Sequence, residues 1–204
     1  VEGSTDTPAP KINWINKDEA LFYEIIEKEG KGLEPFWVDR NDIRVKEARP
    51  LLFQQAYVAR PKNKSGKLPG MEIEYKVETA KDDEAIGNLL IKGDNLLALN
   101  SLKKLFDRRE EEDKVKCIYI DPPYNTGSAF ELYDDNLSHS EWLTMMRDRL
   151  IVLKELLRQD GFLCMQLDDS EGPYGKVLLD SIFGRDNHVI TLYVQVRYDD
   201  KTLK

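Results

Sequence analysis

From residue 88 onward, short apolar runs alternate with longer amphipathic runs, and this alternation limits the folds that the chain can adopt. The apolar runs predict buried strands over residues 89–91, 115–120, 162–167 and 189–196. Helices are expected over residues 94–108, from 138 to a stop at 160–161, and over 175–183. This alternation predicts an α/β fold with helices on both faces of a mostly parallel sheet. Chemistry in such sheets lies at the carboxyl ends of strands, where Asp121 and Asp168 are expected.

Two helix starts carry a recognisable signal. Asp94 can cap the first of these helices. Ser138 and Glu141 have the spacing of a capping box at the start of the second helix. The apolar positions of that helix share one face, which we expect to be buried: Trp142, Met146, Leu150, Leu153 and Leu157.

The N-terminal part of the chain is less regular. Residues 1–15 are small, polar and proline-containing, and are expected to form a disordered lead-in. Residues 16–86 form an extension in which 17–29 has the pattern of an amphipathic helix, and 51–58 and 71–77 have the pattern of strands. Residues 87–204 then form one partial α/β domain.

Composition excludes several classes of protein. The chain has a net charge of -8, which counts against a main DNA-gripping surface in this segment. It has neither an apolar run long enough to cross a bilayer nor a signal peptide at its start, so a cytoplasmic location is expected. Cys117 and Cys164 lie in apolar runs and are interpreted as buried thiols of a reducing compartment. No metal site is predicted, and His139 and His188 are interpreted as surface or packing residues.

The most informative motif is Asp121-Pro122-Pro123-Tyr124, directly after an apolar strand. The lone pair of an exocyclic amine is delocalised into the ring of its base, so the nitrogen is a weak nucleophile. The Asp121 carboxylate and the Pro122 carbonyl could accept its two protons and turn the lone pair toward a methyl donor. The two prolines stiffen the turn, and rigid acceptors favour catalysis by positioning. Tyr124 offers a face on which a flipped-out base can stack.

On its own, the tetrapeptide is also compatible with an ordinary turn, because Pro-Pro marks loops in many proteins. Here it continues as Asn125-Thr126-Gly127, and the whole heptapeptide resembles the catalytic motif of beta-class DNA adenine-N6 methyltransferases. The resemblance is greatest to the modification (Mod) subunits of type III restriction-modification systems. Residues 90–96, 142–150, 161–171 and 182–187 resemble further family segments in the same order.

The resemblance implies a Rossmann-like S-adenosylmethionine-dependent methyltransferase fold. This is a three-layer αβα arrangement with a mostly parallel sheet, which would be incomplete here and preceded by the N-terminal extension. It also implies S-adenosylmethionine as cofactor and double-stranded DNA as substrate. Residues 87–204 would be part of the catalytic domain.

The family's functional residues map onto few positions of this chain. Asp121, with Pro122 and Pro123, would bind the N6 amine next to the cofactor, and Tyr124 would stack on the adenine. Asp94 would lie near S-adenosylmethionine, although a helix cap explains it equally well.

A target-base pocket is implied at three further positions, Asn125, Asp168 and Asp169. For the two aspartates, a turn that starts a helix is the alternative, because acidic side chains are favourable at helix N-termini.

The chain departs from the family in one respect. Beta-class enzymes carry a glycine-rich Phe-x-Gly-x-Gly cofactor loop after the catalytic motif, and nothing downstream of Tyr124 matches it. A target-recognition domain is also missing. We therefore expect an N-terminal fragment that is inactive alone, exposes apolar sheet surface and self-associates as a homodimer through it.

Two other functions remain open. Another amino-methyltransferase, such as a cytosine-N4 or a protein-glutamine enzyme, is the first alternative, but these enzymes usually carry Ser or Asn where this chain has Asp121. A non-enzymatic assembly module is the second alternative, with residues 11–84 docking the restriction subunit of a type III system.

The missing glycine-rich loop leads to a binding prediction. Titration of this chain with S-adenosylmethionine in a calorimeter should show weak binding or none, because the loop that would hold the cofactor is absent. The complete gene product that contains the chain should bind in a parallel titration. Tight binding by the chain alone would show that residues around Asp94 and Asp121 suffice, and would contradict the fragment interpretation.

Overall fold

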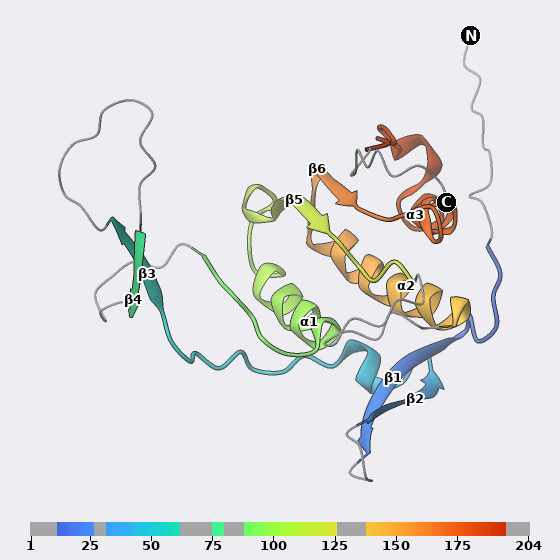
Figure 1. Ribbon diagram of the computed structural model, residues 1–204, viewed down its shortest axis with the longest axis horizontal. Helices are drawn as coiled ribbons and strands as arrows, with labels where there is room; N and C mark the ends of the chain where they lie inside the picture. Colours follow the sequence, from blue (N-terminus) through green and yellow to red (C-terminus); the bar gives the residue numbers. More distant parts are fainter. Residues whose placement is uncertain (1–11, 27–31, 62–74, 80–87, 126–137, 195–204) are drawn as a thin grey trace, which may run out of the picture.

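The computed structural model describes residues 12–26, 32–61, 75–79, 88–125 and 138–194 (Figure 1). Its strands are β1 Glu19–Ile26, β2 Gly32–Asp39, β3 Tyr57–Pro61, β4 Tyr75–Thr79, β5 Val115–Ile120 and β6 Leu157–Met165. Its α-helices are α1 Asn95–Phe106, α2 His139–Leu156 and α3 Gly172–Phe183, and short 3-10 turns cover Ile43–Lys46, Glu111–Asp113 and Arg185–Asn187. In the described parts, the strands pair as β1–β2, β3–β4 and β5–β6.

The half of the molecule that contains Asp121 is built on the β5–α2–β6 unit. β5 and β6 run parallel, with Ile118 opposite Leu163 and Ile120 opposite Met165. A parallel pair needs a long crossover connection, which α2 provides. The prediction of an α/β domain with parallel strands is therefore confirmed for this pair.

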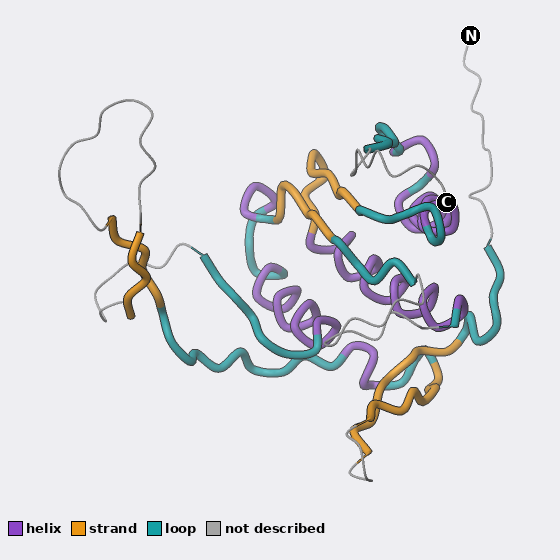
Figure 2. The backbone as a smooth tube through the Cα atoms, viewed as in Figure 1, coloured by secondary structure: helices purple, strands orange, loops and turns teal. Residues whose placement is uncertain are grey.

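α2 is the centre of the hydrophobic core. Its buried face includes Trp142, Leu143, Met146 and Leu150, and it packs against Leu178 of α3. The predicted capping box is present, because the Ser138 side chain accepts from the Glu141 amide while the Glu141 carboxylate accepts from the Ser138 amide. Figure 2 shows α1, α2 and α3 gathered around the two strands.

α3 approaches the sheet closely at one glycine. A Cβ atom at Gly175 would lie 2.5 Å from Leu167 Cδ1 and 2.9 Å from Met165 Cε. Side-chain atoms do not approach this closely, so a larger residue would force the ends of the Leu167 and Met165 side chains to move. Gly175 therefore allows these two side chains to pack directly against α3.

The opposite face of the β5–β6 pair is open, contrary to the expectation of helices on both faces. Tyr119 is 63% exposed and Phe162 50% exposed, and the thiols of Cys117 and Cys164 on the same face are free and exposed. The interpretation of two buried thiols is therefore wrong, because no described segment covers this face. The expectation of exposed apolar sheet surface is confirmed.

The segment expected to be a helix over residues 17–29 instead forms the strand β1 from Glu19 to Ile26, after a turn that includes residues 17 and 18. β1 pairs antiparallel with β2, and the rings of Phe22 and Phe36 stack across the pair with centroids 5.9 Å apart. A short apolar run cannot be assigned from periodicity alone, and aromatic and β-branched residues favour a strand. The residue pattern alone was compatible with either a helix or a strand, and the pairing with β2 selects the strand.

Several element boundaries also differ from those predicted. Residues 89–91 and 189–194 have no regular secondary structure, and Leu90 and Val189 are exposed, because neither segment finds a strand to pair with among the described residues. α2 ends at Leu156, and β6 begins at once and runs through the expected stop at 160–161. The strand expected over 51–58 begins only at Tyr57.

Other predictions lie partly or wholly outside the described residues. The structure does not describe residues 1–11 of the lead-in expected over 1–15, residues 71–74 of the strand expected over 71–77, or residues 126–137 and 195–196. Ile12 and Trp14 of the expected lead-in pack against the hydrophobic core, and β4 begins at Tyr75. The β3–β4 hairpin stands apart from the body of the molecule in Figure 1. In the part of the chain that the structure describes, no helix has the length and hydrophobicity needed to cross a bilayer.

A buried ion pair joins the N-terminal extension to α2. The Arg147 guanidinium contacts the Asp148 carboxylate at 2.8 Å and also donates to the backbone carbonyls of Lys17 and Glu19. Both charged side chains are almost fully buried. Burial lowers the pKa of Arg147 and raises the pKa of Asp148, although their attraction opposes both shifts.

Removing one member of this pair should therefore be costly. We expect Arg147→Met to lower the free energy of unfolding by about 3–5 kcal/mol, because Asp148 would remain buried without its partner. Urea denaturation measures the change, with Arg109→Met at an exposed arginine as the control. The double variant Arg147→Met/Asp148→Asn should recover part of the loss, and a loss no larger than that of the control would refute the coupling.

The same variant should also acquire a pH dependence. Without Arg147, the pKa of Asp148 in the folded chain should rise further above its value in the unfolded chain. Asp148 then binds its proton more tightly in the folded chain than in the unfolded chain. Its contribution to the free energy of unfolding is therefore greatest at low pH and is lost as pH rises through its pKa in the folded chain. Arg147→Met should therefore lose more stability relative to the parent at pH 7 than at pH 4.5.

Candidate active site

The predicted catalytic loop leaves β5 at its carboxyl end. Asp121 follows Ile120 directly, and the amide of Gln166 donates to the Ile120 carbonyl at 2.9 Å, so the parallel pairing continues to the start of the loop. The Asp121 side chain is exposed, whereas Pro122 to Asn125 are partly buried. The carboxylate therefore faces solvent from a backbone that the sheet holds in place.

The middle of the loop is attached to α2. The indole nitrogen of Trp142, whose side chain is fully buried, donates to the carbonyl of Pro123 at 2.8 Å. The residue that fills the core therefore also fixes the turn. The Pro123 carbonyl is engaged in this bond, and the predicted acceptor for a substrate amine, the Pro122 carbonyl, is a different group.

The hydroxyl of Tyr124 belongs to a hydrogen-bonded chain along the open face of the sheet. Tyr119 donates to the side-chain oxygen of Gln166, and the side-chain nitrogen of Gln166 donates to the Tyr124 hydroxyl. Burial raises the pKa of Tyr124, and the nearby Asp121 carboxylate raises it further, while Gln166 opposes the shift. The ring of Tyr124 is thus tied to β6 and remains a neutral phenol.

The end of the loop has an unusual backbone conformation. Asn125 has φ 57°, in the left-handed region, and its side-chain nitrogen donates to Glu171 Oε1 at 2.8 Å. Asparagine tolerates this region better than most residues. The loop is therefore held at Pro123 by α2 and at Asn125 by the residue that precedes α3.

Asp94 lies at the start of α1, as expected for a helix cap. Its Oδ1 accepts from the amides of Leu96 at 2.9 Å and Leu97 at 3.0 Å. Its other oxygen is 3.7 Å from the guanidinium of Arg149 on α2, and the side chain is exposed. The cap is therefore present, and the exposed carboxylate leaves the predicted cofactor contact open to test.

Asp168 and Asp169 lie in the turn between β6 and α3. The Asp168 carboxylate accepts from the Ser170 amide at 2.9 Å, and its backbone carbonyl accepts from the Gly172 amide at 3.0 Å. The Asp169 side chain is exposed. Asp168 thus forms the turn that starts α3. A role of Asp168 or Asp169 in a target-base pocket stays a prediction.

Three residues that hold the loop were not assigned this role from the sequence. Trp142 was predicted only as a core residue, and Gln166 and Glu171 only as parts of a strand and an acidic turn. Gln166 offered one signal, because it is a polar residue at the end of an apolar run. The bonds of Trp142 and Glu171 to the loop join residues far apart in the sequence, which no local pattern reveals.

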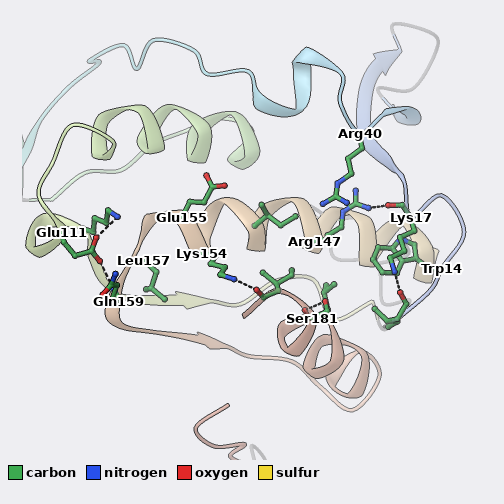
Figure 3. Close-up of a pocket in the computed structure, with 15 residues that line it drawn as sticks. Trp14, Lys17, Arg40, Glu111, Arg147, Lys154, Glu155, Leu157, Gln159 and Ser181 are labelled. Carbon is green, nitrogen blue, oxygen red and sulfur yellow. Dashed lines mark hydrogen bonds and ion pairs between the residues drawn. The ribbon is translucent and has the colours of Figure 1, made fainter. Parts of the chain in front are cut away.

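A groove of about 820 Å³ lies elsewhere, along α2 and α3. Figure 3 shows Lys17, Arg40 and Arg147 at one end of it and Glu111 and Gln159 at the other. None of the predicted site residues lines this groove. It is therefore separate from the loop that begins at Asp121.

Comparison with known proteins matches the part of the chain that contains the loop at Asp121. Residues 115–200 match the family model described as DNA methylase. The "Probable type III restriction-modification enzyme HindVI Mod subunit" of Haemophilus influenzae is 44% identical over 128 residues, which is 63% of this chain and 16% of that protein. The type III restriction-modification enzyme EcoP15I Mod subunit of Escherichia coli is 36% identical over an alignment of 132 residues, and the match covers 50% of this chain and 20% of that protein.

A type II relative is similar to the same extent. The methyltransferase M.EcaI of Enterobacter cloacae is 40% identical over 108 residues, which is 50% of this chain and 23% of that protein. The chain thus spans less than a quarter of the length of each of these three relatives. Residues 115–200 are therefore similar to a DNA methylase domain, and the chain is similar to the Mod subunits of type III restriction-modification enzymes.

Proposed function

We propose that this chain supplies the catalytic loop of a DNA adenine-N6 methyltransferase that belongs to a restriction-modification system. The observation that carries the proposal is the placement of Asp121, an exposed carboxylate at the carboxyl end of the parallel strand β5. It is followed by a Pro-Pro turn that Trp142 holds from the core. The relatives named above support the same assignment.

The loop offers what an exocyclic amine needs in order to react. The Asp121 carboxylate accepts one N6 hydrogen and the Pro122 carbonyl accepts the other, which returns the lone pair to the nitrogen. Once S-adenosylmethionine is bound, the nitrogen would attack its methyl carbon as the bond from that carbon to the sulfonium sulfur breaks. The sulfur would leave as a neutral thioether, and the proton lost from the nitrogen would pass to Asp121 or to solvent. Acceptors that are already in place contribute mainly by positioning the reactants.

Tyr124 provides the surface for the target base. Its hydroxyl is held by Gln166, which leaves the ring as a fixed flat face beside Asp121. An adenine inside a duplex cannot reach this loop, so the substrate is a base flipped out of double-stranded DNA. Aromatic stacking suits such a base, because it replaces the stacking lost on flipping.

S-adenosylmethionine is the proposed cofactor, and it supplies an electrophilic methyl group on a sulfonium. The described residues offer two exposed carboxylates, Asp94 and Asp121, which fit a ligand that carries a sulfonium and an ammonium charge. Asp94 keeps one oxygen directed away from the cap of α1 and could hold the cofactor there. The complete domain would then be Rossmann-like, with further strands beside β5 and β6.

The proposed partners are DNA, a restriction subunit and a second copy of the complete protein. One observation favours an assembly role for the N-terminal extension. The segment before β3 exposes Leu52 by 77% and Phe53 by 76%, and the β3–β4 hairpin stands apart from the body (Figure 1). Such apolar residues at the edge of a molecule are typical of surfaces that bind other proteins.

Substitution of Asp121 tests the catalytic proposal. In the complete gene product, Asp121→Ala should lower kcat for DNA methylation at least about a hundredfold, because the amine loses a proton acceptor. Mass spectrometry of nucleosides from the treated DNA measures the product, which should be N6-methyladenine. Asp113→Ala, at an exposed aspartate before β5, is the matched control and should retain parental activity.

Two outcomes would change the assignment. N4-methylcytosine as the product would identify a cytosine enzyme of similar architecture. If the parental protein binds both S-adenosylmethionine and a restriction subunit but methylates no DNA, this result would favour the assembly role.

A further inference from the structure

Glu171 is a buried carboxylate at the point where the catalytic loop, α2 and α3 meet. Its side chain is only 3% exposed. Its Oε1 accepts from the side-chain nitrogen of Asn125 at 2.8 Å and lies 3.1 Å from Nδ1 of His139, the first residue of α2. Three elements that are distant in sequence are thus joined at one acidic group.

The usual reason for an acidic residue at this position does not apply. Glu171 precedes α3, where a side chain commonly caps the helix, but its carboxylate makes no capping hydrogen bond. Its Oε2 lies 3.0 Å from His139 Nδ1 without hydrogen-bond geometry, and has no hydrogen-bond partner among the described residues. A buried carboxylate that is incompletely paired costs stability, so its presence calls for another explanation.

The contact with Asn125 provides one. A carboxylate only accepts hydrogen bonds, so the Asn125 amide must direct its nitrogen toward Glu171. This bond holds the side chain of a residue whose backbone has φ 57°, a region that an L-residue enters at some cost. Glu171 therefore stabilises the left-handed backbone conformation of Asn125, the residue that follows the Asp121-Pro122-Pro123-Tyr124 segment.

We infer that Glu171 is a positioning residue for the catalytic loop and acts through Asn125. Trp142 holds the loop before Tyr124, at the Pro123 carbonyl, and Glu171 holds it after Tyr124. The two anchors flank Tyr124, whose hydroxyl also bonds to the exposed Asp121 carboxylate. This inference rests on the proposed methyltransferase function for its effect on rate, but its structural part can be tested without activity.

The structural test uses the Trp142 indole proton as a reporter, since it donates to the loop. The chain has three tryptophans, so the indole region of a proton–nitrogen NMR spectrum is simple, and Trp142→Phe assigns the signal by its loss. Glu171→Ala and Asn125→Gly should both move or broaden this signal. Glycine at 125 keeps the left-handed turn accessible but removes the tether. Glu155→Ala, at an exposed glutamate of α2, should leave the signal in place.

The kinetic test uses the complete gene product. Glu171→Ala should lower kcat by roughly 10- to 100-fold, with KM for S-adenosylmethionine changed less than about twofold, because misplaced reactants slow the chemical step. Glu171→Gln, which can still accept from Asn125, should show a smaller loss. The double variant Glu171→Ala/Asn125→Gly should be no slower than the slower single variant, because both changes break one interaction.

Each result decides between positioning and a merely structural role. Effects of the two single changes that multiply in the double variant would overturn the inference, as would an unchanged Trp142 signal in both single variants. A loss of thermal stability in Glu171→Ala with kcat preserved below the melting temperature would also overturn it. If the parental protein methylates no DNA, the proposed function fails, whereas the NMR result still decides whether Glu171 places the loop.

Discussion

The burial of Trp142 is the interaction on which the rest of this structure depends. Its ring fills the space between α2, α3 and the sheet, and its indole nitrogen donates to the Pro123 carbonyl. A large apolar surface and one directional bond are thus combined in a single side chain. The stability of the core and the shape of the loop are therefore not independent, because the residue that secures one also secures the other.

How much could be predicted from the sequence depended on whether the signal was local. The capping box at Ser138, the helix after Asp94 and the strand before Asp121 are encoded in a few neighbouring residues, and all three are confirmed. β1 was predicted as a helix, because its pairing with β2 is a contact between two segments that no local pattern revealed. Cys117 and Cys164 were placed in a covered sheet, but burial depends on segments elsewhere in the molecule.

The candidate site divides in the same way. The position of Asp121 at the end of β5 could be predicted, because the motif and its strand are contiguous. The groups that hold the loop could not be predicted, because Trp142, Gln166 and Glu171 reach it across 19, 42 and 46 positions of sequence. Backbone motifs thus identify the reacting groups, whereas their orientation depends on contacts that only the fold brings together.

The open face of the β5–β6 pair has a consequence for how such a domain is switched on. Tyr119 lies on that face and is the first member of the hydrogen-bonded chain that reaches Tyr124 through Gln166. Any segment or partner that packs on this face removes water from the chain, and hydrogen bonds strengthen as the local dielectric constant falls. Packing on this face and tightening of Tyr124, the residue that we propose stacks on the target base, would then be thermodynamically linked. The proposed catalytic loop would be poorly organised for as long as this face stays open.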